Sequence, residues 1–156
     1  KGHGGRSGSW LQAVQGSDPS PGSFPNAASI TDAVNLGTVA LRAGKKVLFC
    51  SDGDYTVFVH DLAEAGADGF IFEPCVDFRF MVDNFSDSKC LVGSFTDCRD
   101  LTLGHWEKVK SDIDRTFERL AHCRGAIVAV GNHLPPNIPP VLLDRYFEYL
   151  LPRLER

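Results

Sequence analysis

Val47-Leu48-Phe49-Cys50-Ser51-Asp52-Gly53-Asp54 is the segment that best indicates how this chain folds. It is a short apolar run that ends in a turn carrying a thiol and two carboxylates. Three further apolar runs end in the same way: Gly69-Phe70-Ile71-Phe72 before Glu73-Pro74-Cys75, Cys90-Leu91-Val92-Gly93 before Thr96-Asp97-Cys98-Arg99, and Ala126-Ile127-Val128-Ala129-Val130 before Gly131-Asn132-His133. In a β/α protein the carboxyl ends of parallel strands lie on one face. We therefore expect the four clusters to form one shared site.

The rest of the chain supplies the helices that such a protein needs. Residues 1–26 are rich in Gly, Ser and Pro and are predicted to be a loop segment. Apolar residues at helical spacing predict a helix over 27–43, which Gly44 ends. Four β-α units follow, with strands over 47–50, 70–72, 90–95 and 126–130. Their helices are predicted over 55–65, over 76–85, from 106 to the glycine at 125, and from Pro140 to about residue 151.

This alternation predicts an α/β fold with a parallel sheet and right-handed crossovers. Four units fit either an open sheet or half of an eightfold barrel. The sequence has no Gly-x-Gly-x-x-Gly motif after the first strand and no Walker motif, which removes the best signal for a nucleotide-binding open sheet. Chemistry at several strand ends favours the carboxyl-terminal half of a TIM-type (β/α)8 barrel. We therefore expect residues 1–156 to be a single partial domain.

Composition excludes several classes of protein. The 156 residues carry a net charge of -4 with no long run of one sign, which argues against nucleic-acid binding. No apolar stretch approaches the roughly 18 residues of a membrane span, and no signal peptide is apparent. The five cysteines are an odd number and contain no Cys-x-x-Cys pair. A reducing, cytoplasmic location is the simplest interpretation.

The carboxylates at the strand ends are the first candidates for chemistry. Asp52 and Asp54 can bind a cation or divide acid and base roles. Asp54 can also cap the helix that begins near Tyr55, so we assign Asp54 mainly to capping and Asp52 mainly to function. At the third strand end, Arg99 can clamp a substrate carboxylate. Alternatively, Asp97 and Arg99 form an internal ion pair, or their loop caps the next helix.

A divalent metal such as zinc is a second hypothesis, because thiolate, imidazole and carboxylate ligands are all present at the strand ends. The possible ligands are Cys50, Asp52, Glu73, Cys75, Cys98 and His133. No local spacing motif supports this site, whose typical pair would be Cys50 and His133. Turn and proline residues fix His133, which suits proton transfer or ligation. His3-Gly4-Gly5-Arg6 could form another loop of the site, with Arg6 facing an anion.

Several of these segments resemble the uroporphyrinogen decarboxylase superfamily. Residues 44–54 resemble its fifth-strand segment, which usually has the form His-Ser-Asp-Gly-Asp. Residues 93–104 resemble a later strand with its Leu-Thr-x-Gly turn, and residues 131–140 resemble the final strand end. His3-Gly4-Gly5 and Ser20-Pro21-Gly22-Ser23-Phe24 are similar to the family's Gly-rich loop and the start of its middle helix. The resemblance is nearly continuous from about residue 20 to 156.

The resemblance implies the carboxyl-terminal half of a TIM-type barrel. The family comprises porphyrinogen decarboxylases and zinc-dependent methyltransferases that serve corrinoid proteins or thiols. The methyltransferases' His-x-Cys zinc pair falls on Cys50 and Asp52 here. Their third ligand, like the decarboxylases' last-strand His, falls on Asn132 or His133. The decarboxylases' arginine cluster and main catalytic Asp lie near the family's amino-terminal strand and have no counterpart in these residues. We therefore expect zinc only in an altered site of Cys50 with His133.

Together these observations predict an enzyme of the superfamily that is more similar to its methyltransferases. The predicted catalytic residues are Asp52, Asp97 and His133. The predicted substrate-binding residues are Asp54, Glu73, Arg99, Asn132, His3 and Arg6. The alternatives are porphyrinogen decarboxylation and a non-catalytic half-barrel. The expected partners are a small-molecule or tetrapyrrole substrate and a corrinoid protein. A second chain or an amino-terminal half is expected to complete the barrel, since four units leave two exposed sheet edges.

Overall fold

The computed structural model of the chain describes residues 41–131 and 134–155. The predicted loop over 1–26 and most of the predicted helix over 27–43 lie outside the described residues. The end of that helix is described: Leu41 and Arg42 are helical, and the N–H of Gly44 donates to the Leu41 carbonyl at 2.9 Å. Gly44 has φ +68, a left-handed conformation that glycine adopts without strain, so it ends the helix as predicted.

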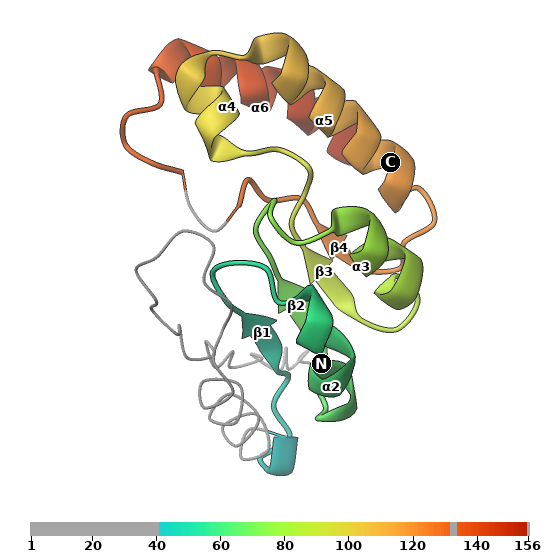
Figure 1. The fold of residues 1–156 in the computed structure, drawn as a ribbon. Helices are drawn as coiled ribbons and strands as arrows, with labels where there is room; N and C mark the ends of the chain where they lie inside the picture. Colours follow the sequence, from blue (N-terminus) through green and yellow to red (C-terminus); the bar gives the residue numbers. More distant parts are fainter. Residues whose placement is uncertain (1–40, 132–133, 156) are drawn as a thin grey trace, which may run out of the picture.

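Four short parallel strands form one sheet in the order β1-β2-β3-β4 (Figure 1). The strands are β1 (Leu48–Cys50), β2 (Gly69–Ile71), β3 (Cys90–Val92) and β4 (Ala126–Ile127). The pairing brings the last residues of the strands level with one another, since Cys50 lies opposite Ile71, Ile71 opposite Val92, and Val92 opposite Ile127. The residues that follow each strand therefore start from one line across the sheet.

Helices alternate with these strands, as the sequence predicts. They are the 3-10 turn η1 (Thr56–Phe58) followed by α2 (Val59–Glu64), then α3 (Phe78–Phe85), α4 (Cys98–Leu103), α5 (Trp106–Leu120) and α6 (Pro140–Leu154). In Figure 1, α2 and α3 lie in front of the sheet, and α5 and α6 pack against each other. The fold is α/β, and a four-stranded, all-parallel sheet that alternates with helices is consistent with half of a TIM-type barrel.

Several predicted boundaries are wrong. The strands predicted to reach residues 95 and 130 end at Val92 and Ile127. Gly93 still forms backbone hydrogen bonds with Ile127 and Ala129, but the N–H of Phe95 donates to the side chain of Thr116. The helix α3 begins at Phe78, because the Asp77 side chain accepts hydrogen bonds from the N–H groups of the first turn.

The helical part of the chain also departs from the predictions. The segment after Asp97, predicted as a turn, contains the helix α4, which Gly104 ends at φ +74. The helix α5 ends at Leu120 rather than near Gly125, whose carbonyl instead accepts a strand hydrogen bond from Leu91 at 3.1 Å. The helix α6 continues to Leu154, with Pro152 inside its last turn.

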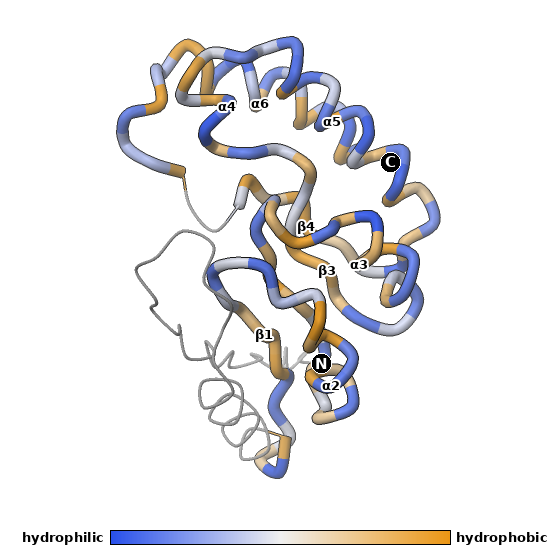
Figure 2. Tube along the Cα trace, viewed as in Figure 1, coloured by the Kyte–Doolittle hydropathy of each residue, from blue (hydrophilic) through white to orange (hydrophobic). Residues whose placement is uncertain are grey.

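The buried apolar side chains form two clusters. Figure 2 shows how apolar and polar residues are distributed along the trace of the chain. One lies between the sheet and the helices α2 and α3 and is rich in phenylalanine: Phe49, Phe70, Phe72, Phe78 and Phe85. The other lies among α4, α5 and α6 and includes Leu101, Val109, Ile113, Tyr146 and Leu150. The two clusters flank the polar loop that follows β3. No helix among the described residues is both long and apolar enough to cross a membrane.

Candidate functional site

The four strand-end segments meet, as the sequence predicts. Beyond β1 and β2, the N–H of Gly53 donates to the Glu73 carboxylate at 3.4 Å. Beyond β4, Gly131 has φ +52, and a Cβ placed there would lie 3.7 Å from the Pro74 side chain. The end of β4 therefore lies against the segment that follows β2. Asn132 and His133 continue from this point, but they lie outside the described residues, as do His3 and Arg6.

The turn beyond β1 holds the two predicted carboxylates in different roles. Asp54 accepts hydrogen bonds from the backbone N–H of Thr56, at 2.9 Å, and from the hydroxyl of the same residue. These contacts satisfy the start of η1, which is the capping role that we assign mainly to Asp54. Asp52 is half-buried in the same turn, close enough to Cys50 for its charge to act on that thiol.

Three thiols share this edge of the sheet. Burial raises the pKa of Cys50, and the charges of Asp52 and Glu73 raise it further. Burial also raises the pKa of Cys75 and of Cys98, and in both cases Glu73 adds to the effect. The charge of Glu73 thus acts on all three thiols. At neutral pH these cysteines are protonated thiols, which are weak nucleophiles.

Asp97 and Arg99 are joined by hydrogen bonds and by an ion pair. Asp97 caps α4 by accepting from the N–H of Arg99 at 2.8 Å, and it also accepts from the guanidinium, with Nε at 2.9 Å. The hydrogen bond from Arg99 lowers the pKa of Asp97. The Arg99 side chain is 80% exposed and that of Asp97 is 15% exposed. These contacts match the ion-pair and capping alternatives, while a substrate clamp by Arg99 stays a prediction.

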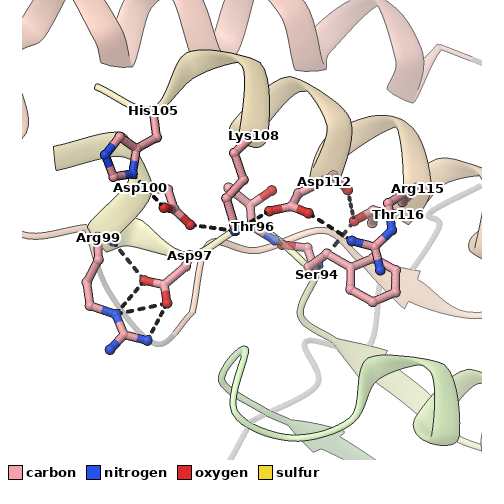
Figure 3. Close-up of polar contacts among 11 residues, drawn as sticks. Ser94, Thr96, Asp97, Arg99, Asp100, His105, Lys108, Asp112, Arg115 and Thr116 are labelled. Carbon is pink, nitrogen blue, oxygen red and sulfur yellow. Dashed lines mark hydrogen bonds and ion pairs between the residues drawn. The ribbon is translucent and has the colours of Figure 1, made fainter. Parts of the chain in front are cut away.

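A polar network behind Asp97 was not among the predicted site residues (Figure 3). Asp112 of α5 is only 4% exposed, and its carboxylate accepts from Lys108 at 2.8 Å and from Arg115 at 3.1 Å. Lys108 also donates to Asp100 of α4 at 2.6 Å. The signal in the sequence is that Asp112 and Thr116 lie three and seven positions after Val109, beside the apolar stripe of α5. A carboxylate there must be paired.

Histidines outside the predicted site differ in their surroundings. His105 is exposed, and its Nδ1 lies 3.0 Å from Asp100, at the end of the same network. His60 is exposed and its ring lies 5.8 Å from the ring of Phe80. Neither residue lies at a strand end.

The described residues do not complete a metal site by themselves. Within residues 41–131 and 134–155, no group of three His, Cys, Asp or Glu side chains is placed to hold a metal ion. The predicted pair of Cys50 with His133 depends on a residue outside this range, so it stays a prediction.

A cavity of about 620 Å³ lies between α3 and α5, and Phe95 of the segment that follows β3 contributes to its lining. Its lining includes Arg79, Arg115, Arg119 and Glu118, but none of the predicted site residues. The polar side chains at the strand ends are therefore a better candidate for the functional site than this groove.

The comparison with known families agrees with this arrangement. The family model described as uroporphyrinogen decarboxylase (URO-D) matches residues 23–150, which include all four strands and most of α6. The search of curated proteins finds no match to this chain. The family match covers well over half of the sequence, and it agrees with the parallel sheet and with the resemblance of the strand-end segments. The chain therefore belongs to the uroporphyrinogen decarboxylase family.

Proposed function

We propose that this chain is part of a methyl-transfer enzyme of the family, which takes a methyl group from a neutral or cationic donor. The observation that supports this proposal best is the charge of the strand-end segments. Residues 51–55, 72–77, 93–97 and 128–131 contain no Lys or Arg. Their charged side chains are all carboxylates: Asp52, Asp54, Glu73, Asp77 and Asp97.

Two basic residues lie near these carboxylates in sequence: Arg79, which is exposed and lines the cavity between α3 and α5, and Arg99. Arg99 forms an ion pair with Asp97. The guanidinium N–H groups that donate to this carboxylate are therefore not available to bind a substrate. The described part of the site is therefore acidic. Two unit charges about 4 Å apart interact by about 4 kcal/mol at the effective dielectric of a protein surface. A ligand that brings several carboxylates to this edge would meet repulsion, whereas a methylated ammonium or sulfonium group would be attracted.

The negative charge of the strand-end segments favours one of the two enzymatic alternatives over the other. A porphyrinogen substrate of the decarboxylases is a polycarboxylate and needs cationic partners. A methyl donor is neutral or cationic, and carboxylates such as Asp52 and Glu73 suit it better. We therefore place porphyrinogen decarboxylation second, since nothing in the described site favours it over methyl transfer.

In the proposed reaction, the bond between the methyl carbon and the donor heteroatom breaks, and the leaving group keeps the electron pair. The acceptor, a thiolate or a reduced corrinoid, supplies the pair for the new bond. Asp52 and Glu73 bind and orient the donor. His133 takes up or returns protons, and Asp97, which Arg99 keeps ionised, lines the reacting site. Asp54, Arg99, Asn132, His3 and Arg6 complete the binding surface. If zinc is bound, by Cys50 and His133, it would stabilise the acceptor as a thiolate.

The proposal is tested on the full-length protein, kept under nitrogen. Methylated amines, a sulfonium and a methyl ether are supplied in turn with a thiol or with reduced cobalamin, and methyl transfer is followed by mass spectrometry and by the methylcobalamin spectrum. Uroporphyrinogen is supplied in parallel, and release of carbon dioxide is measured, together with the zinc content. The expected result is methyl transfer without carbon dioxide release. Metal-free protein that decarboxylates the porphyrinogen would refute the proposal.

Two matched variants link the activity to the acidic strand ends. Glu73→Gln removes a charge from the centre of the site while keeping the size of the side chain. Asp87→Asn removes a charge from an exposed residue between α3 and β3, at the amino ends of the strands. We expect Glu73→Gln to raise the KM of a cationic donor about tenfold and Asp87→Asn to leave it unchanged. Equal KM values for the two variants would show that the charge of Glu73 does not contribute to donor binding.

A further inference from the structure

We propose that Thr116 and Asp112 of α5 are positioning residues, which hold the β3–α4 loop (residues 93–97) and thereby fix Asp97 at the strand-end site. The proposal rests on the proposed function only in taking Asp97 as part of the reacting site. The positioning itself follows from hydrogen bonds that join α5 to the loop (Figure 3).

Gly93 still donates to the Ile127 carbonyl, and beyond it the loop amides find side-chain acceptors. The N–H of Phe95 donates to the Thr116 hydroxyl at 3.2 Å. The N–H of Thr96 donates to the hydroxyl of Ser94 at 3.0 Å, and that hydroxyl donates to the Ala129 carbonyl at 2.7 Å. Two consecutive loop amides therefore have side-chain acceptors. Removing an acceptor would leave a buried N–H unsatisfied, which favours movement of the loop.

Thr116 is itself fixed by the helix. Its hydroxyl donates to the backbone carbonyl of Asp112 at 2.7 Å, and the residue is fully buried. This bond uses the hydroxyl hydrogen, which leaves the oxygen lone pairs directed to the loop amide of Phe95. The hydroxyl therefore works as a fixed connection between one turn of α5 and the loop.

Asp112, in the same turn of α5 as Thr116, is linked through Lys108 to the residues that follow Asp97. Its carboxylate accepts from Lys108, and Lys108 donates also to Asp100, three residues beyond Asp97 in the first turn of α4. His105 bonds to Asp100 as well, at 3.0 Å. The loop and the start of α4 are thus held from α5 at two points, one before Asp97 and one after it.

Such a network is better suited to fixing geometry than to adding stability. A buried ion pair often contributes no more than apolar residues of the same volume, because desolvation opposes the attraction of the charges. A satisfied network does, however, define one arrangement of the groups that it joins. The arrangement defined here is the position of the Asp97 backbone relative to β3 and α5.

Thr116→Val is the direct test, because valine keeps the shape of threonine and removes only the hydroxyl. Thr102→Val is its matched control: the Thr102 hydroxyl also donates to the carbonyl four residues earlier, that of Cys98 at 2.9 Å, but it accepts no amide from the β3–α4 loop. Thr116→Ser restores the hydroxyl. Lys108→Met, at a side chain that is 56% exposed, removes the second connection without touching the core.

Hydrogen exchange of the peptide that contains residues 94–99 is measured by mass spectrometry on the full-length protein. We expect about tenfold faster exchange in Thr116→Val and in Lys108→Met but not in Thr102→Val or Thr116→Ser. Unchanged exchange in both Thr116→Val and Lys108→Met would overturn the proposal. If Thr116→Val fails to fold, Lys108→Met decides alone.

Turnover gives the functional readout. We expect kcat for methyl transfer to fall about tenfold in Thr116→Val with little change in KM, and Thr116→Ser to recover it. A lower kcat that serine does not recover would refute positioning by the hydroxyl. If the wild-type protein shows no methyl transfer, the proposed function fails, whereas the exchange measurement still decides whether α5 holds the loop.

Discussion

Gly93 shows how closely the chain packs at the site. A Cβ placed on this residue, which follows β3 directly, would lie 2.4 Å from the ring of Phe72. Phe72 is 2% exposed and its ring also packs against Phe78, so it has little room to move. The phenylalanine core therefore reaches up to the strand ends and supports the backbone from which the β3–α4 loop departs.

The first prediction follows from this contact. Gly93→Ala should lower the free energy of unfolding by roughly 1–3 kcal/mol, because the added methyl group overpacks a filled core. Gly125→Ala is the control, since a Cβ there would have no atom within 4 Å. Its effect should stay within about 0.5 kcal/mol. Urea denaturation of the two variants measures both values, and equal effects would contradict the packing described here.

The sequence predicted the residue types at the site better than their contacts. That Cys50, Asp52 and Glu73 share an edge follows from apolar runs that end in polar residues, because parallel strands place such ends together. The pairing of Asp97 with Arg99 stood as one of several alternatives, since spacing alone does not fix where a long side chain turns. The role of Thr116 could not be predicted, because it depends on a contact with a residue 21 positions away.

At the scale of secondary structure, one carboxylate joins the starts of two strands. Asp68, which precedes β2, accepts from the backbone N–H of Val47 at 2.9 Å and from Lys46 at 2.7 Å. Burial alone would raise the pKa of Asp68, but the hydrogen bonds from Lys46 and Val47 hold it below its ordinary value. The ionised form is therefore favoured in the folded protein, and it fixes the amino ends of β1 and β2.

The second prediction concerns pH. Because the folded-state pKa of Asp68 is lowered, its contribution is complete above the unfolded value of about 3.9 and is lost as pH falls through the folded value. Asp68→Ala should cost about 1–2 kcal/mol at pH 7, and this difference from the wild type should shrink toward pH 3. Asp87→Ala, at an exposed carboxylate, serves as control. A difference that stays constant from pH 7 to pH 3 would exclude the ionised group as its source.

The helices were easier to predict than the strands, for physical reasons. The start of α5 at Trp106 and that of α6 at Pro140 follow from apolar spacing and from proline at the first turn. The strands are only two or three residues long, too short for a period to show, and their ends depend on which partner each amide finds. The helix α4 was missed because six residues between an Asp cap and Gly104 resemble a turn.

At the scale of the whole molecule, β4 forms one edge of the sheet, since it pairs with β3 alone among the residues that the structure describes. Both residues of β4 are exposed, and Ile127 is 55% exposed although it is in a parallel strand. Parallel sheets in β/α proteins are normally covered on both faces, and an exposed apolar edge strand is a site for pairing with another strand. We expect further β-α units to pair with β4 in the complete barrel.

The third prediction tests this completion. Ile127→Lys in the full-length protein should lower the melting temperature by several degrees, corresponding to about 2 kcal/mol or more, because a neighbouring strand would bury the charge. Val57→Lys is the matched control, at a valine that is 70% exposed in η1. It should leave the melting temperature nearly unchanged. A full-length protein that tolerates both substitutions equally would have an open β4 edge.

The central claim is that the strand-end site is acidic and accepts a neutral or cationic ligand. Its most direct test is the affinity of uroporphyrin, a stable octacarboxylate, for the wild-type protein and for Glu73→Gln, measured by fluorescence at low ionic strength, where charge effects are least screened. We expect uroporphyrin to bind the wild-type protein weakly and to bind Glu73→Gln more tightly, because this variant has lost one negative charge. Tight binding by the wild type that weakens or stays the same in Glu73→Gln would contradict the central claim.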